Sequence, residues 1–273
     1  MKSKDFRRLL IAVLFFLATV SGGCGFALGF DSSRREIKFN RGLAYEALEE
    51  YRSAADCYEA VANNSKSNYK FPADESVLRL ARVYSAHLNS PDSAVFYYRK
   101  FLSAVPESNR HPRVLIELAN YYRDLARLDL SLDTYREFLD RYPDSELKQE
   151  VYYNKGKVHI KKDEVDLAAK EFKFLLEKYP NGNLADGACY YLASTYGQIG
   201  NKVKQLKYYK KILNEFPASD LREISAFRAI KLALELSRKE QARNIAEKYR
   251  EEFEEGSYRQ DIEKLLSGEE DSD

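Results

Sequence analysis

The side chains best suited to metal binding or catalysis are few in this 273-residue chain and lie far apart. Its three histidines are His87, His111 and His159, and none belongs to a His-x-x-x-His or Cys-x-x-Cys pattern. Zinc sites need several such ligands at close and regular spacing. We therefore expect no metal site and no cofactor, and we expect His159 to serve in core packing.

Other reaction centres are equally hard to assemble from these residues. The glycine-rich stretch at 22–25 lies inside an apolar segment and does not fit the pattern of a phosphate-binding loop. The acidic pairs at 251–252 and 254–255 fit a solvated helix end. No nucleophile has a base at a meaningful spacing, so we expect a protein without catalytic residues that is not an enzyme.

The composition favours a folded helical protein. Hydrophobic residues make up 44% of the chain and charged residues 32%, and the net charge is +1. Nucleic-acid-binding domains are usually clearly basic, so we expect no nucleic-acid partner. Only 7 prolines and 12 glycines occur, whereas there are 21 tyrosines, which suits helices packed through aromatic side chains. Three cysteines do not make a disulfide framework.

An uncharged, largely apolar segment near the amino terminus predicts contact with a membrane. Residues 9–30 contain no charged side chain and follow a basic stretch that includes Arg7 and Arg8. As a helix this run is about 33 Å long, enough to cross a hydrocarbon core of about 30 Å. We therefore assign residues 1–30 to a signal or anchor segment.

Two modes of anchoring fit this segment. Small residues before Cys24 resemble a lipoprotein signal, in which that cysteine would be lipidated, although Ser21 stands where leucine is usual and the following residues stay apolar. The alternative is an uncleaved transmembrane helix that keeps Arg7 and Arg8 in the cytoplasm. In a bacterium both modes place the rest of the chain in the periplasm, anchored to the inner or the outer membrane.

The body of the chain repeats with a fixed period. Pro106, Pro143, Pro180 and Pro217 are each separated by 37 residues, and an aromatic residue stands eight positions before each of them: Tyr98, Tyr135, Phe172 and Tyr209. Gly42, Tyr45, Ala54 and Tyr58 align an earlier unit, so six units cover roughly residues 35–265. A period of this length indicates stacked supersecondary units.

Each unit is predicted to be a pair of antiparallel helices. Apolar residues follow helical spacing over 113–125 and again over about 129–141, with a short link between them. The proline cannot continue the second helix, so it ends the unit. Small residues at Ala119, Gly156 and Ala193, and again at Ala94 and Ala168, let the helices approach closely.

This order of a small residue, tyrosine, alanine, an aromatic residue and proline resembles the tetratricopeptide repeat (TPR). The resemblance implies an all-α fold, an α-solenoid of about six helix-turn-helix repeats over residues 31–265, behind the membrane segment and before an acidic disordered tail at 266–273. The unit endings resemble the bacterial cell-envelope branch, typified by the outer-membrane assembly lipoprotein BamD and by the YbgF (CpoB) family. The amino-terminal coiled coil of the second family is not evident here.

The resemblance implies a protein-binding scaffold tethered to a membrane, with other envelope-assembly subunits as partners. Its alternatives are an adaptor for division or peptidoglycan machinery, or an accessory subunit of an enzyme or secretion complex. Such repeats bind partners on a concave face lined by their first helices. On this template the exposed positions, which mix cations with aromatic rings, are Arg82, Asn120, Arg123, Tyr153, Lys157, Lys161, Tyr190, Ser194 and Gln198. They suit an acidic segment or a peptide carboxylate, or else form an ordinary solvated face.

Overall fold

The computed structural model describes residues 30–63 and 72–268, and within these ranges it contains helices and no strand. This confirms the predicted all-α fold and the stacked helical repeats. In chain order the helices are α2 (Phe30–Ala47), α3 (Tyr51–Ala62), α4 (Ala73–Ala86), α5 (Pro91–Ala104), α6 (His111–Asp124), α7 (Leu128–Arg141), α8 (Lys148–Lys161), α9 (Val165–Lys178), α10 (Ala185–Gln198), α11 (Lys202–Glu215), α12 (Arg222–Glu235), α13 (Lys239–Glu252) and α14 (Arg259–Ser267).

Parts of the predicted terminal segments lie outside the described residues. Of the proposed signal or anchor segment at 1–30, only Phe30 is described, as the first residue of α2, so Cys24 is not placed. Residues 269–273 of the predicted acidic tail are also outside. Among the helices of residues 30–63 and 72–268, none is both long and apolar enough to cross a membrane.

The helix boundaries account for the 37-residue period. From α8 onward, a 14-residue helix, a turn of three residues, a second 14-residue helix and a loop of six residues follow one another. The second helices α5, α7, α9 and α11 end two residues before Pro106, Pro143, Pro180 and Pro217. Proline lacks an amide donor and disfavours helical geometry in the residue before it, which explains why these second helices end at equivalent positions.

The turn inside each repeat depends on one residue in the left-handed backbone region. These residues occupy equivalent places in six turns and are Glu49, Asn89, Ala126, Asp163, Gly200 and Ser237, with φ between 45° and 71°. Only one of them is a glycine, although this conformation is sterically unfavourable for residues that have a Cβ atom. The six turns therefore share a left-handed residue that could not be predicted from residue type.

The small residues and the aromatic residues meet in the core, as predicted. Gly156 and Phe172 are both buried, and a Cβ placed on Gly156 would lie 2.6 Å from the ring of Phe172. Gly42 and Tyr58 repeat this arrangement, with a separation of 2.5 Å. The aromatic ring thus occupies the space that a side chain on the first helix would need. These two contacts confirm the alignment of the earliest repeat.

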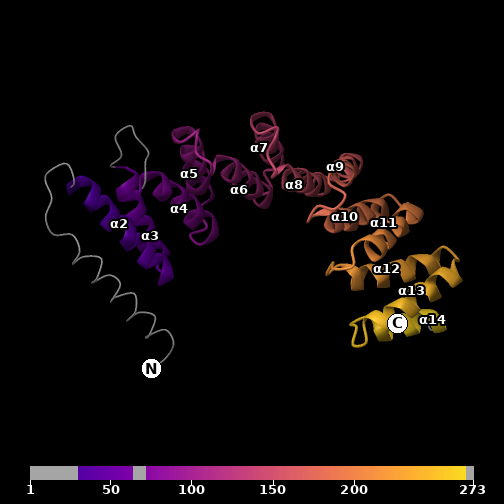
Figure 1. The fold of residues 1–273 in the computed structure, drawn as a ribbon. Coiled ribbons are helices and arrows are strands. Elements are labelled where there is room, and N and C mark those ends of the chain that lie inside the picture. The colour runs from indigo at the N-terminus through magenta and orange to yellow at the C-terminus, as the bar shows by residue number, and fades with distance from the viewer. Residues whose placement is uncertain (1–29, 64–71, 269–273) are drawn as a thin grey trace, which may run out of the picture. The chain divides into compact units, whose positions relative to one another are not determined.

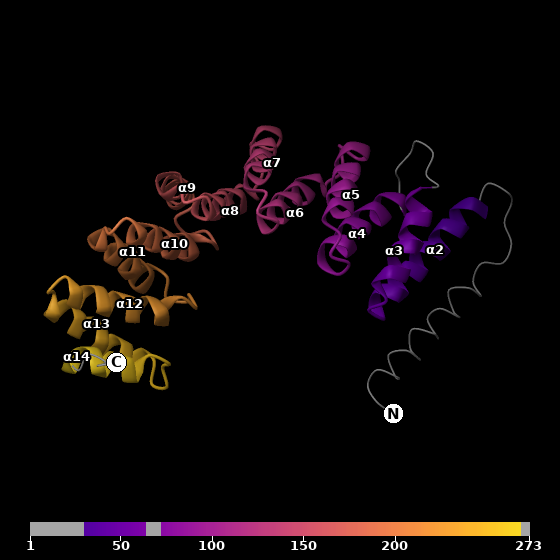
Figure 2. The ribbon, with the colours of Figure 1, turned by 180° about the vertical axis from the view of Figure 1, so that it is seen from behind.

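The helices form two compact units, residues 1–125 and 126–273. In the first, the pairs α2/α3 and α4/α5 pack in chain order and α6 contacts α5. In the second, α7 is followed by the pairs α8/α9, α10/α11 and α12/α13, each in contact with the next (Figure 1). The reverse view shows the same stacking of α8 to α13 (Figure 2).

The helix α14 covers one end of this second unit. It packs against α12 and α13, and it contributes the buried Ile262 to the core that runs from α10 to α13. It extends to Ser267, beyond the predicted end of the solenoid at 265, and Gly268 caps it with φ of 80°. A terminal helix with a polar outer side is expected where a repeat array would otherwise expose its apolar face.

Candidate protein-binding face

The predicted binding residues occupy regular positions on the first helices of the repeats. Tyr153, Lys157 and Lys161 are the sixth, tenth and fourteenth residues of α8, and Tyr190, Ser194 and Gln198 hold the same positions in α10. Arg82 and Asn120 are the tenth residues of α4 and α6, and Arg123 follows Asn120 by one turn. The surface that these positions form is called the first-helix face below.

In residues 30–125 the first-helix face consists of linked charges. Arg82 of α4 donates to both carboxylate oxygens of Glu117 on α6, at 3.0 and 2.8 Å. Arg79 pairs with Glu46 of α2 at 2.9 Å and with Glu75 one turn earlier at 3.0 Å. The pairs Arg82–Glu117 and Arg79–Glu46 join one first helix to the next, so both guanidinium groups already have acidic partners.

Asn120 and Arg123 form a local pair on α6. The guanidinium of Arg123 donates to the Asn120 side chain at 2.9 Å and to Asp124 at 3.0 Å. Only 13% of the Arg123 side chain is exposed. The sequence predicted an exposed cation at this position, whereas the structure places it largely against the helix surface.

In residues 126–273 aromatic rings replace the charge pairs. The Tyr153 ring of α8 meets Tyr191 of α10 edge to face at 5.6 Å between centroids, and it meets Phe172 of α9 at 6.0 Å. The Lys157 amine lies 5.5 Å from the centroid of Tyr153 and 5.8 Å from that of Tyr191. A cation at this distance from aromatic rings is attracted by their electron density.

The aromatic arrangement continues onto the next first helix. The Arg228 guanidinium of α12 lies 5.2 Å from the centroid of Tyr190, and it donates to the Tyr209 hydroxyl at 2.9 Å. Tyr190 also contacts Tyr191 and Tyr209 edge to face. A row of rings and cations therefore runs over α8, α10 and α12.

The tyrosine hydroxyls of this row are protonated at neutral pH, and burial raises their pKa further. Tyr153 is partly buried, and burial raises the pKa of its hydroxyl to about 12. Burial likewise raises the pKa of Tyr190. At neutral pH both hydroxyls can donate hydrogen bonds, and the charge of the row comes from Lys157 and Arg228.

Tyr191 and Arg228 were not among the binding residues predicted from the sequence. Both are the seventh residue of their helix and are 37 residues apart, so the repeat spacing itself could have identified the second from the first. Lys161 and Gln198 are exposed at the ends of α8 and α10, and Ser194 is half-buried. The structure thus joins Tyr153, Lys157 and Tyr190 in one row, and places Arg82, Asn120 and Arg123 in the other unit.

The histidines and Cys189 have packing roles and are not part of the first-helix row. His159 is buried and its Nδ1 lies 2.6 Å from Glu164, as expected for a residue of the core. The buried His111 contacts the Leu102 carbonyl, and the exposed His87 stacks on Tyr51. Cys189 is buried in the core, where burial raises the pKa of its thiol to about 12.

Known proteins agree with this architecture. The family model for the tetratricopeptide repeat matches residues 75–108 and 113–145. The first segment spans α4 and α5, and the second spans α6 and α7. No curated protein sequence matches the chain.

Solved structures show the same fold at low sequence identity. PilW, described as a widely conserved type IV pilus biogenesis factor, is 20% identical, with a TM-score of 0.54 over 84% of this chain and 97% of its own. PilF from Pseudomonas aeruginosa is 18% identical, with a TM-score of 0.53 over 85% and 97%. BtubC from P. vanneervenii is 15% identical, with a TM-score of 0.59 over 77% and 90%. At this level of identity the likeness is one of fold.

The helix pairs, the shared turn and the matched segments lead to one structural conclusion. Within each unit, side chains of neighbouring first helices meet, as in Arg82–Glu117, Tyr153–Tyr191 and Arg228–Tyr190. Residues 75–108 and 113–145 carry tetratricopeptide repeats, and the described helices follow the same helix-pair pattern.

Proposed function

We propose that this protein is a non-catalytic scaffold that binds an extended segment of another protein on the first-helix face of residues 126–273. The observation that carries the proposal is the row of cations and aromatic rings over α8, α10 and α12. Its central members are Lys157 against Tyr153 and Tyr191, and Arg228 against Tyr190. Stacked first helices present such a row to one continuous ligand.

The chemistry of the row favours an acidic segment or a carboxyl terminus. Lysine and arginine supply charge-assisted hydrogen bonds to carboxylates, and tyrosine supplies a flat contact area that loses little entropy on binding. The amide of Gln198 and the hydroxyl of Ser194 can bond to the main chain of a bound segment. In residues 30–125 the corresponding cations, such as Arg82, are paired with carboxylates.

We place this scaffold in a bacterial cell envelope. The support is the uncharged run at 9–30 behind Arg7 and Arg8, which suits either a lipidated Cys24 or a membrane helix with the repeats in the periplasm. A part in outer-membrane protein assembly, like that of BamD, is the specific role we propose. The alternatives are a CpoB-like adaptor for division or peptidoglycan machinery and an accessory subunit of an enzyme or secretion complex.

In-cell crosslinking followed by purification of the full-length chain tests the scaffold. The variant Lys157→Glu/Lys161→Glu reverses two charges on the first-helix face. The matched control, Arg136→Glu/Lys239→Glu, reverses two exposed charges on α7 and α13. We expect partners that crosslink to the wild type and to the control but are lost from the first-helix variant.

The identity of the partner separates the roles. Barrel-assembly subunits support the BamD-like role, Pal or peptidoglycan synthases support the adaptor, and a stoichiometric partner with its own active site supports the accessory subunit. Partners that survive the Lys157→Glu/Lys161→Glu variant would move the binding site elsewhere. The absence of any specific partner, even for the wild type, would overturn the scaffold proposal.

The variant Cys24→Ser tests the mode of anchoring. If Cys24 is lipidated, processing stops and a heavier precursor accumulates in the membrane fraction. An unchanged apparent mass and an unchanged membrane fraction would rule out the lipoprotein mode and favour the uncleaved helix.

A further inference from the structure

The second helices of residues 126–273 form a separate surface with two grooves. One groove, of about 470 Å³, lies along α9, the end of α10 and the start of α11, and its lining includes Lys170, Lys173 and Lys204. The other, of about 550 Å³, lies between α11, α12 and α13, and its lining includes Lys210 and Lys248. We call this surface the second-helix face. None of the residues of the first-helix row lines either groove.

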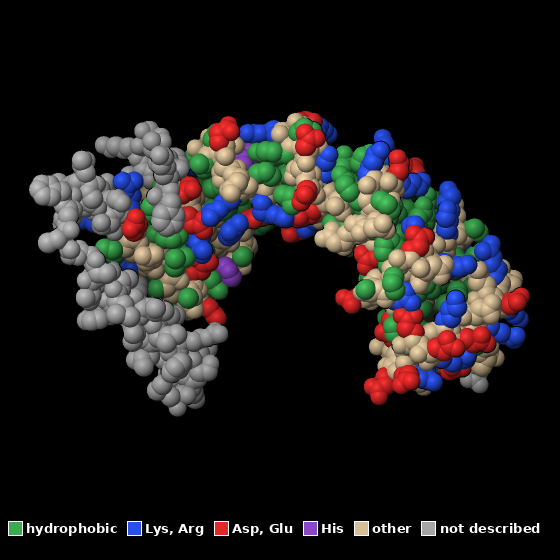
Figure 3. Space-filling view, in the orientation of Figure 1, with side chains coloured by type: hydrophobic (Ala, Val, Ile, Leu, Met, Phe, Trp, Pro, Cys, Tyr) green, Lys and Arg blue, Asp and Glu red, His purple; other side chains and the backbone are tan. Residues whose placement is uncertain are grey.

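Lysines without acidic partners dominate the second-helix face. Basic side chains are spread along the side of the second unit on which α9 and α11 lie, among acidic, hydrophobic and other side chains (Figure 3). In the ranges that the structure describes, no carboxylate lies within ion-pair distance of six of these lysines, namely Lys170, Lys173, Lys204, Lys207, Lys210 and Lys248. This differs from the first unit, where Arg79 and Arg82 are paired with carboxylates.

Aromatic rings fix several of these lysines in place. The amines of Lys173 and Lys204 lie 5.4 and 5.0 Å from the centroid of Tyr196, and the amine of Lys207 lies 5.8 Å from that of Tyr208. Tyr196 is almost fully buried and stacks on Tyr208. The cations are therefore oriented before any ligand arrives, which lowers the entropy cost of binding one.

The floors of both grooves are partly apolar. Ile199 is 52% exposed and lines the first groove together with Ala169 and Phe174. Leu213 and Ile245 line the second groove, and the buried Oε1 of Gln241 has no hydrogen-bond partner among the described residues. Each groove thus combines cations with apolar surface, and the second adds a polar acceptor for an N–H group.

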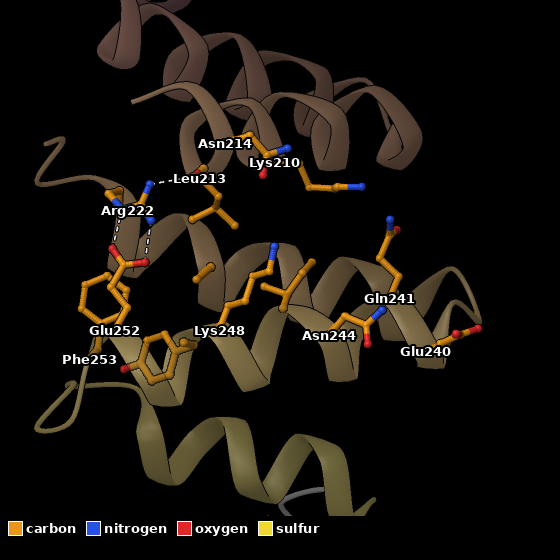
Figure 4. A pocket seen from close by; sticks show the side chains of 13 residues that line it. Lys210, Leu213, Asn214, Arg222, Glu240, Gln241, Asn244, Lys248, Glu252 and Phe253 are labelled. Atoms are coloured by element: carbon orange, nitrogen blue, oxygen red, sulfur yellow. Dashed lines mark hydrogen bonds and ion pairs between the residues drawn. The ribbon is translucent and has the colours of Figure 1, made fainter. Parts of the chain in front are cut away.

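Four acidic residues also line the grooves. Asp166 and Glu177 belong to the first, and Glu240 and Glu252 belong to the second. Arg222 binds both oxygens of Glu252 at 2.5 Å, which neutralises that carboxylate, while Lys248 extends from α13 toward α11 (Figure 4). Glu177 pairs with Lys178 at 3.7 Å, so among the described residues Asp166 and Glu240 are the groove-lining carboxylates without a basic partner, against the six lysines.

We propose that the second-helix face binds an acidic polypeptide segment that carries aliphatic or aromatic side chains, independently of the first-helix face. Its carboxylates meet the lysines, and its apolar side chains enter the two grooves. The chemistry favours a peptide over a nucleic acid because the grooves combine apolar side chains with the lysines and the chain as a whole has a pI near 7.6.

A library of random dodecapeptides displayed on phage, selected against the full-length protein, tests this proposal without assuming a sequence. We expect enriched peptides to combine several acidic residues with at least one aliphatic or aromatic residue. Their binding is then measured by fluorescence anisotropy of synthetic copies. It should weaken as salt rises, because exposed charges are screened.

Two variants locate the binding. Lys173→Glu/Lys204→Glu reverses the first groove, and Lys210→Glu/Lys248→Glu reverses the second. The matched control, Arg136→Glu/Lys231→Glu, makes the same charge change at two exposed positions that line neither groove. We expect each groove variant to weaken binding at least tenfold and the control to change it less than twofold. Because reversal next to Tyr196 could disturb folding, Lys173→Gln/Lys204→Gln serves as a milder variant, and circular dichroism checks all of them.

The outcomes separate the two proposals. If every enriched peptide loses affinity only in Lys157→Glu/Lys161→Glu, the peptides bind the first-helix face and this inference is overturned. Enriched peptides that lack acidic residues, or that bind all variants equally, also overturn it. A random single-stranded oligonucleotide and vesicles of anionic phospholipid are tested in parallel. Binding of either one that depends on these lysines, without any acidic peptide, would assign the face to that other class of ligand.

Discussion

Arg82 and Glu117 are 35 residues apart in the chain and lie on neighbouring first helices, where they form a two-point ion pair. Arg82 is the tenth residue of α4 and Glu117 the seventh residue of α6. The same two helix positions are joined in the second unit, where Lys157 of α8 lies against the Tyr191 ring of α10. One structural position therefore serves an ion pair in one unit and a cation–aromatic contact in the other.

The ion pair should contribute little to stability. Nearly half of the Arg82 side chain is exposed, and pairs of this kind typically contribute about 0.2–1 kcal/mol. A double-mutant cycle with Arg82→Ala and Glu117→Ala, measured by urea unfolding, should give a coupling in that range that shrinks at high salt. A coupling above about 2 kcal/mol that is insensitive to salt would show that the pair is desolvated in solution.

Most of the fold could be predicted from the sequence because the same residue types recur at equivalent positions of each repeat. Prolines at 37-residue intervals mark the end of each second helix, and small residues such as Gly156 mark where helices approach. Each of these depends on local sterics, which act in the same way in every repeat. Helix α14 was not predicted as a separate element because no second helix follows it among the described residues, although it begins 37 residues after α12.

The binding residues were harder to predict because exposure depends on neighbouring helices. The template predicted exposed cations at Arg82 and Arg123, yet Arg82 is paired with Glu117 and Arg123 is largely covered. Tyr191 and Arg228 were missed because a seventh-position residue faces the preceding repeat, so its role depends on what that repeat presents. The grooves of the second-helix face join three or more helices, and no single repeat contains them.

Substitution of Gly156 tests the close packing inside a repeat. In Gly156→Ala the new methyl group would lie 2.6 Å from the Phe172 ring, and such overpacking typically costs about 1–3 kcal/mol. We expect a lower midpoint of urea unfolding. The control is Gly156→Ala in combination with Phe172→Leu, which frees space at the contact and should cost less than the sum of the two single changes. Strict additivity would show that the two residues do not compete for space.

The turn residues predict opposite effects at equivalent positions. Gly200 and Ser237 both have left-handed backbones, with φ of 71° and 59°. The methyl group added by Gly200→Ala would have no atom within 4 Å, so only the backbone conformation matters. We expect the free energy of unfolding to fall by about 1 kcal/mol. Ser237→Gly should stabilise by up to about 1 kcal/mol, since glycine adopts this conformation freely. Effects of the same sign in thermal unfolding would contradict the shared turn geometry.

The buried thiol of Cys189 predicts a dependence of stability on pH. Burial raises its pKa from 9.0 to about 12, so the folded chain keeps the thiol neutral where the unfolded chain ionises it. A raised pKa gives stability that is present below pH 9 and is lost as the pH rises toward 12. Because tyrosines titrate in the same window, the informative quantity is the difference between the wild type and Cys189→Ala in the slope of unfolding free energy against pH.

The two placed cysteines should also differ in reactivity. In a chain that carries Cys24→Ser, Ellman's reagent at pH 8 should modify the half-buried Cys57 well before Cys189. Equal rates of modification would show that the α10–α11 contact opens readily in the folded protein.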